Sequence, residues 1–201
     1  MESSGAKKDA AKYPVFTHHV SRLLGSARSI AIYVAFRNNR DELIPCDLLI
    51  GMYVASLECI SEFWLRPQVL DSFVVSHCKW REPRALTWQR WHDEWQKSTR
   101  RLRFPFYITF GGKRWASSLN GLMFKESPDW TRLFKTGESL TPYKATLRDS
   151  TLPLLTPEIM LLAFIRTEGI PLCQRLEETG LMVDKLEEAA NRQIDNPEDL
   201  M

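Results

Sequence analysis

The sequence predicts a mainly α-helical domain built from two similar halves, with an inserted Trp/Arg-rich segment that contains a small β-hairpin. Internal similarity is the first observation behind this. The segments "ELIPCDLLIGMYVASLECISEFWL" (42–65) and "LLTPEIMLLAFIRTEGIPLCQRL" (154–176) both begin a helix at a proline, carry an acidic residue in the first turn, and run through apolar residues into a second helix. The second observation is the change of composition between them. Two similar halves in one chain indicate a pseudo-two-fold helical domain.

Composition limits the classes of protein to which the chain can belong. Of its 201 residues, 44% are hydrophobic and 26% are charged, which is typical of a globular domain. The formal net charge of +2 is too small for charge alone to bind a polyanion. No apolar run is long enough to cross a bilayer, and the first residues lack the apolar stretch of a signal peptide. We therefore expect a cytoplasmic protein with no membrane partner.

The pattern along the chain predicts one domain over residues 13–195. Residues 1–12 are small and polar and are expected to be disordered. The insertion that interrupts the domain covers about 79–150. Residues 196–201 form an acidic tail that is expected to fray.

The first half is expected to open with a helix that has Thr17 as its N-cap and ends at Asn38. Gly25 lies inside this helix, where glycine costs about 1 kcal/mol relative to alanine, so it predicts a second helix crossing closely at that point. Pro45 suits the first turn of the next helix, because its missing N–H is no loss there. The helix after that is expected to break near Pro67.

The insertion is rich in Trp, Arg and Lys between about 79 and 130. Its tryptophans recur at helical spacing and predict one helix that contains Trp88, Trp91 and Trp95. After it, "FPFYITFGGKRWAS" predicts a β-hairpin with Gly111 and Gly112 as its turn. Residues 137–153 are expected to be mostly loop.

The second half carries the clearest helix start in the chain. Thr156 is the expected N-cap, Pro157 the first helical residue, and Glu158 lies in the first turn. The helix is expected to turn at Gly169 into a second helix that Gly180 closes, and 181–193 predicts a third. Four residues on the apolar faces of the two halves are expected to be buried: Leu49, Met52, Leu161 and Phe164.

These motifs resemble the N-terminal repeat domain of the Clp ATPases, the Clp N family. Each half of that domain opens with a Phe-Thr helix start, continues with a Thr-Glu-His-Leu-Leu-Leu-Gly-Leu type helix, and ends with Leu-Glu-x-x-Gly and an Asp-x-x-Leu tail. The matching residues here are Phe16, Thr17, Leu48, Leu49, Ile50 and Gly51 in the first half, and Glu158, Met160 to Ala163, Glu168, Gly169, Leu176, Glu177, Gly180, Asp184 and Leu186 in the second.

The chain also departs from the family pattern. Residues 79–150 have no counterpart, and the opening helix of the second half is expected to be missing or degenerate. Cys46 stands at the position of the family glutamate in the first half, and Asp47 at that of the histidine. The phosphate-binding motif G-x-x-x-x-G-K-[ST] occurs nowhere, so the ATPase module is absent from this sequence.

The resemblance implies a non-enzymatic recognition module of chaperone-related type, an adaptor or substrate-binding domain. Its implied partner is a protein or peptide segment, with a Clp ATPase or its substrate as the candidate. Some family members bind phosphorylated arginine through paired glutamates at the starts of equivalent helices. In this chain the glutamate of the second half is matched by Glu158. In the first half Cys46 stands at the position of the glutamate, and the acidic residue Asp47 is its neighbour. A guanidinium is bound best by two acceptors in a fixed fork. Because a cysteine stands at position 46 in place of the family glutamate, the expectation of phosphoarginine binding is weakened.

Each candidate residue has a simpler structural explanation. For Asp47 and Glu158 this explanation is the helix dipole, since acidic residues in a first turn stabilise a helix by about 0.3–1 kcal/mol. Cys46 is then a packed thiol. The tryptophans of the insertion are either a core stripe or a surface for docking a protein or nucleic acid. That surface would consist of Trp88, Trp91, Trp95, Arg100 and Arg101.

No catalytic or metal-binding constellation is recognisable. The motifs G-x-S-x-G and H-E-x-x-H are both absent. The four cysteines, which are Cys46, Cys59, Cys78 and Cys173, contain no C-x-x-C pair, and they predict small buried side chains in a reducing compartment. We therefore expect no enzyme activity, no cofactor and no metal.

Overall fold

Most of the described chain is helical. The computed structural model describes residues 17–66, 68–101, 108–110, 113–115, 124–147, 150–192 and 197–201. Beyond Asp93, α5 is described by its backbone alone. The predictions for residues 1–12, for Phe16 and for the turn at Gly111 and Gly112 lie outside these ranges.

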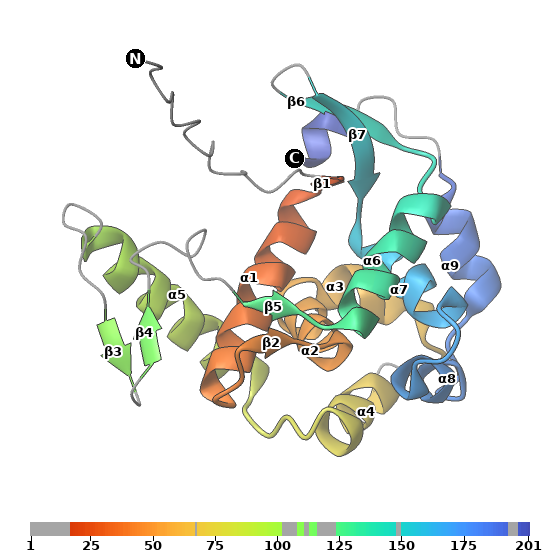
Figure 1. The fold of residues 1–201 in the computed structure, drawn as a ribbon. Helices are drawn as coiled ribbons and strands as arrows, with labels where there is room; N and C mark the ends of the chain where they lie inside the picture. The colour runs from red at the N-terminus through yellow and green to blue at the C-terminus, as the bar shows by residue number, and fades with distance from the viewer. Residues whose placement is uncertain are drawn as a thin grey trace, which may run out of the picture.

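The first half consists of two short strands, each leading into a helix, followed by smaller helices. Its elements are β1 (His19–Val20), α1 (Arg22–Arg37), β2 (Glu42–Leu43), α2 (Pro45–Ala55), α3 (Leu57–Ile60), the 3-10 helix η1 (Ser61–Phe63) and α4 (Gln68–His77). α1 packs along α2 at the centre of the molecule (Figure 1). The predicted break near Pro67 is confirmed, since η1 and α4 are separate.

The inserted segment stands to one side of this body (Figure 1). It contains α5 (Arg84–Arg101), β3 (Ile108–Phe110) and β4 (Lys113–Trp115). β3 pairs antiparallel with β4, with Phe110 opposite Lys113, so the predicted helix and hairpin are both confirmed.

The second half again alternates strands and helices. Its elements are β5 (Lys125–Glu126), α6 (Pro128–Leu140), β6 (Lys144–Leu147), β7 (Ser150–Leu155), α7 (Pro157–Arg166), α8 (Pro171–Glu177), α9 (Val183–Ala190) and the 3-10 helix η3 (Pro197–Leu200). α7 packs against α6, α8 and α9. The helix start at Thr156 is confirmed, because its side chain accepts a hydrogen bond from the Ile159 N–H.

Strands of the first half pair with strands of the second half. β1, which leads into α1, pairs in parallel with β7, which leads into α7. β2, which leads into α2, pairs in parallel with β5, which leads into α6. β6 adds to β7 as an antiparallel hairpin, so the larger sheet has the order β1-β7-β6.

One apolar core joins the helices of both halves. Leu49, Met52, Leu161 and Phe164 are each fully buried, as predicted. A second, smaller cluster contains Tyr143, Ala145 and Leu154, with Leu200 and Met201 packed against it.

Several predictions of local structure are wrong. The first helix begins at Arg22 and not beside Thr17, because Ser21 is its N-cap and the residues before it belong to β1. The helix α6 lies within residues 79–150, the range of the expected insertion, where no helix is predicted between 128 and 140. Residues 137–153, predicted to be loop, contain the end of α6, β6 and part of β7.

One prediction about a helix end is also wrong. α8 ends at Glu177 with Glu178 as its C-cap, and Gly180, with φ of 79°, lies in the turn beyond it. In the tail, Pro197–Leu200 form η3, and Leu200 and Met201 pack against the smaller cluster.

Candidate functional site

Each parallel strand pair places two helix starts side by side. Val20 lies opposite Leu155, and the next residues, Ser21 and Thr156, are the N-caps of α1 and α7. The Ser21 N–H donates to the Leu155 carbonyl at 2.8 Å. We call this arrangement the α1–α7 start. Helix starts carry unpaired N–H groups and partial positive charge, so two together suit anionic or peptide-backbone groups.

The other pair repeats this arrangement with α2 and α6. Leu43 lies opposite Glu126, followed by the N-caps Ile44 and Ser127. The Ser127 N–H donates to the Leu43 carbonyl at 3.0 Å. We call this the α2–α6 start. The predicted site residues are therefore divided: Cys46 and Asp47 belong to the α2–α6 start, whereas Glu158 belongs to the α1–α7 start.

Glu158 is half-buried in the first turn of α7. Within the described part of the chain its carboxylate has no hydrogen bond and no ion pair. It lies near Cys59 of α3 and Tyr143 before β6. Burial raises the pKa of both groups, and the negative charge of Glu158 raises each further. This carboxylate is therefore available to accept a hydrogen bond from a cationic group.

Asp47 is fully buried and is used within the fold. Its carboxylate accepts two hydrogen bonds from the Arg40 guanidinium, one of them at 2.7 Å, and a third from the Ile44 N–H at 3.0 Å. Burial raises the pKa of the Asp47 carboxyl, while the bonds from Arg40 and Ile44 favour its charged form. Asp47 caps α2 and holds Arg40, which leaves no acceptor for a partner.

Cys46 is the second residue of α2 and is half-buried. Its pKa is lowered, first by the influence of the Cys78 thiol and also by the charge of Arg40, against the opposing effects of burial and Asp47. The pKa of Cys78, which follows α4, is raised by the Cys46 thiol and by burial.

Along α5 the predicted docking residues differ in exposure. The Trp88 side chain is 40% exposed. Its ring lies 5.0 Å from that of Trp91, which packs against the core. Trp91 therefore belongs in part to the core stripe, whereas Trp88 faces solvent. The side chains of Trp95, Arg100 and Arg101 lie outside the described part of the structure.

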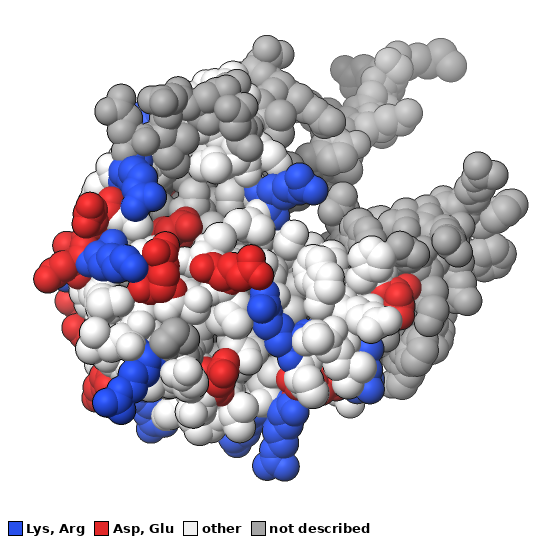
Figure 2. Space-filling model, turned by 180° about the vertical axis from the view of Figure 1, so that it is seen from behind, with Lys and Arg blue, Asp and Glu red and all other residues white. Residues whose placement is uncertain are grey.

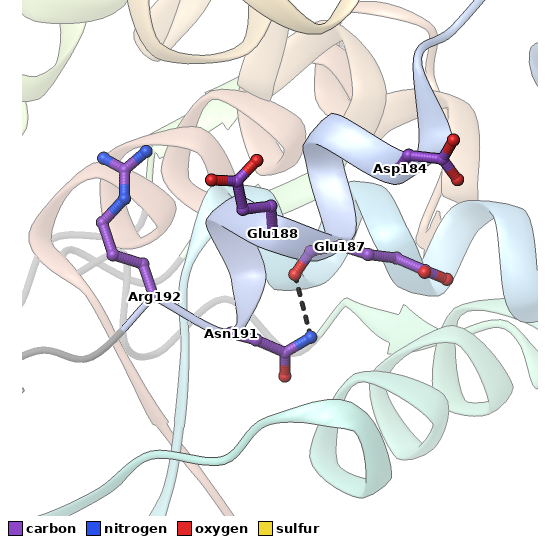
Figure 3. Close-up of a pocket in the computed structure, with 5 residues that line it drawn as sticks. All are labelled: Asp184, Glu187, Glu188, Asn191 and Arg192. Atoms are coloured by element: carbon purple, nitrogen blue, oxygen red, sulfur yellow. Dashed lines mark hydrogen bonds between the residues drawn. The ribbon is translucent and has the colours of Figure 1, made fainter.

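A surface hollow along α9 does not form a converged site. It has a volume of about 510 Å³ and is lined by Asp184, Glu187, Glu188, Asn191 and Arg192. These residues come from α9 and the two positions after it, and their charged groups point in different directions (Figure 3). Figure 2 shows acidic side chains, with basic ones among them, on this side of the molecule. Glu187 is also paired with Arg166.

Comparison with known proteins identifies no relative. No protein-family model matches the chain, and no curated protein or solved structure matches it either. Within the described ranges, no helix combines the length and apolarity needed to cross a membrane. Within the same ranges, no group of three or more His, Cys, Asp or Glu side chains is placed to hold a metal ion. The geometry of the helix starts and the residues around them are therefore the only indications of function in the described part of the chain.

Proposed function

We propose that the chain is a protein-recognition module of the Clp N type, an adaptor or substrate-binding domain with a pseudo-two-fold arrangement of its halves. The pairing of strands between the halves supports the two-fold arrangement. Under such a symmetry β1 corresponds to β5 and β7 to β2, so the pair β1–β7 becomes the pair β5–β2. The matching bonds from Ser21 to Leu155 and from Ser127 to Leu43 support it as well.

The observation that carries the proposed function is the Glu158 carboxylate beside the α1–α7 start, which has no hydrogen bond or ion pair to another described residue. Two helix starts can bind the backbone carbonyls or an anionic group of a peptide. Glu158 adds an acceptor for an arginine or lysine of the same peptide. At the α2–α6 start each acidic side chain is already paired with an arginine: Asp47 with Arg40, Asp129 with Arg132, and Glu126 with Arg28. One peptide-binding position, centred on Glu158, is therefore proposed.

An array of immobilised peptides tests this proposal. Peptides of varied charge are probed with the wild-type chain, and the best ones are titrated by calorimetry with wild type, Glu158→Gln and Glu168→Gln. Glu168 is exposed in the turn after α7 and serves as the matched control. A hydrogen bond to a charged group contributes about 1.5–3 kcal/mol. Peptides that contain arginine or lysine should therefore bind Glu158→Gln roughly tenfold more weakly or worse, and bind the control like wild type.

Two results would contradict the proposal. If no peptide binds the wild-type chain, peptide recognition is wrong. If peptides bind Glu158→Gln as tightly as wild type, Glu158 is not the contact, and the α1–α7 start loses its role.

The exposed ring of Trp88 favours a second function, binding of nucleic acid along α5. An exposed tryptophan can stack on a base, which contributes about 1–3 kcal/mol. Gel-shift titration with single- and double-stranded probes at low salt tests it, using wild type, Trp88→Ala and the charge-reversed pair Arg100→Glu with Arg101→Glu. Binding should weaken in both variants and fall steeply with added salt. Absence of any shift at low salt would eliminate this candidate.

A further inference from the structure

We propose that the tail, residues 197–201, is a displaceable cover over the smaller cluster, and that a peptide with an apolar residue beside an arginine or lysine replaces it there. The cluster consists of Tyr143, Ala145 and Leu154. This proposal rests on the proposed recognition of peptides at Glu158, and it adds the kind of peptide and a means of regulation. It depends on the place of the cluster, on how the tail is held, and on what the sequence of the tail lacks.

The smaller cluster lies at the end of the sheet from which α7 begins. The Tyr143 carbonyl accepts a hydrogen bond from the Leu154 N–H at 3.0 Å. Leu154 is opposite His19 of β1, and Thr156, two residues further on, is the N-cap of α7. The cluster therefore adjoins the α1–α7 start, and Leu154 precedes Glu158 by four residues. In agreement with this position, burial and then the negative charge of Glu158 raise the pKa of the Tyr143 hydroxyl.

The tail covers the cluster through two apolar side chains. Leu200 and Met201 pack against it and are themselves only half-buried. The 3-10 helix η3 lies against β6, and Figure 1 shows the end of the tail, marked C, at the same end of the molecule as β6 and β7. Leucine and methionine side chains contribute packing alone, and a single 3-10 turn has few hydrogen bonds of its own. A segment with so few buried apolar contacts opens more readily than the core.

Displacement of the tail leaves the main core intact. The three buried residues of the smaller cluster form a group separate from the core that joins the two halves. The backbone of the cluster is fixed independently of the tail by the pairing of β6 with β7 and of β7 with β1. The vacated surface is therefore an ordered apolar face beside Glu158.

The tail complements only part of the surface around Glu158. Its apolar side chains match the cluster, but residues 193–201 contain no arginine or lysine, so this segment supplies no cation for Glu158. A peptide with an apolar residue beside an arginine or lysine can make the packing contacts of the tail. It also adds a charge-assisted hydrogen bond that the tail cannot make. Such a peptide should therefore displace the tail.

Competition with the tail would regulate binding. A peptide that needs the cluster binds only those molecules whose tail is displaced, so its apparent dissociation constant is the intrinsic one divided by that fraction. A basic peptide without the apolar residue needs Glu158 alone and is indifferent to the tail. The tail thus selects for peptides that carry both groups.

Methyl NMR of the full wild-type chain follows the tail directly. The protein is isotope-labelled at its methionine methyl groups, and the Met201 signal is assigned with a Met201→Leu sample. The probes are two synthetic peptides of equal length with one arginine, one carrying a leucine beside it and the other a serine in place of that leucine. The leucine peptide should move the Met201 signal toward its position in the urea-unfolded chain, and the serine peptide should not. Met52, fully buried in α2, is the internal control and should not move.

Calorimetry with a tail variant measures the competition. Leu200→Ser combined with Met201→Ser removes the apolar contacts of the tail, and Leu65→Ser, at a residue that is 73% exposed, is the matched control. The leucine peptide should bind the double variant about tenfold more tightly than wild type where the tail is displaced in about a tenth of wild-type molecules. The serine peptide should bind both variants like wild type, and Leu65→Ser should leave both affinities unchanged.

The outcomes separate this proposal from peptide recognition itself. The cover is refuted, and recognition stands, if the leucine peptide binds wild type and loses affinity in Glu158→Gln while the Met201 signal stays in place. Equal affinity of that peptide for wild type and the double variant refutes the cover as well. If neither peptide binds wild type, recognition and the cover are both wrong. A peptide that moves the Met201 signal but binds Glu158→Gln as tightly as wild type would confirm the cover and refute only the role of Glu158.

Discussion

Replacement of Gly51 by alanine should destabilise the protein, because α1 and α2 cross closely at this residue. A Cβ atom on Gly51 would lie 2.1 Å from the Ala27 carbonyl oxygen and 2.9 Å from the carbonyl carbon. Both are backbone atoms, so no side chain can rotate away. The helices would have to separate by more than about 1 Å, while fully buried side chains such as Leu24 and Leu48 pack beside them.

The expected magnitude follows from two opposing effects. Overpacking a well-packed core costs about 1–3 kcal/mol, and a backbone clash this short belongs at the upper end. Alanine is better than glycine in a helix by about 1 kcal/mol, which offsets part of that cost. Gly51→Ala should therefore lower the free energy of unfolding by about 2 kcal/mol, measured by urea denaturation followed by circular dichroism.

Gly25 provides the matched control for this measurement. A Cβ atom there would meet the Val20 side chain at 3.7 Å, which is ordinary contact, so the expected close crossing at Gly25 is wrong. Gly25→Ala should gain helix propensity without a clash and raise the free energy of unfolding by up to about 1 kcal/mol. The reasoning is refuted if Gly51→Ala is as stable as wild type, or if the two variants change stability in the same direction.

Four further variants test other parts of the structure by the same urea denaturation. Leu161→Ala should lose about 2–5 kcal/mol, because Leu161 is fully buried in the core; a loss below about 0.5 kcal/mol would contradict this. Asp47→Ala should lose about 3–5 kcal/mol, because it leaves the Arg40 guanidinium without its carboxylate. Asp41→Ala on the exposed surface should stay within about 0.5 kcal/mol of wild type, and equal losses in the two Asp variants would refute the importance of the buried pair. Burial raises the pKa of the Cys173 thiol from 9.0 to about 12. In that pH window the folded state keeps a proton that the unfolded state loses, so stability should fall as pH rises through it. Cys173→Ala should flatten that slope, and an unchanged slope would contradict the cause.

Elements with strong local signals were predictable from the sequence. The start of α7 carries an N-cap, a proline and an acidic residue in order, and all three positions are as expected. The β3–β4 hairpin follows from its two glycines between alternating residues. In each case the determining interactions lie within a few residues of one another.

α6 was missed although its start, Ser127-Pro128-Asp129, carries the same signal as that of α7. Gly137 and the polar residues after it suggested a loop. In the structure Gly137 lies where α6 meets α7, and a Cβ atom there would come within 2.9 Å of the Met160 sulfur. This glycine therefore reflects close helix packing, which no local pattern reveals.

The strand pairs could not be predicted from the sequence for a related reason. β1, β2 and β5 have two residues each, too few for an alternating pattern. Each is defined by a partner more than 80 positions away.

The two acidic residues nominated from the repeat show how tertiary contacts divide positions that look alike in sequence. Asp47 and Glu158 both lie in the first turn of a helix that begins with proline. Arg40, seven residues before Asp47, donates two hydrogen bonds to its carboxylate at the α2–α6 start. Glu158 has no such residue among those described, and it stays half-buried beside the α1–α7 start. A cationic partner would therefore meet an available acceptor at Glu158, whereas at Asp47 it would have to displace an arginine that the fold already supplies.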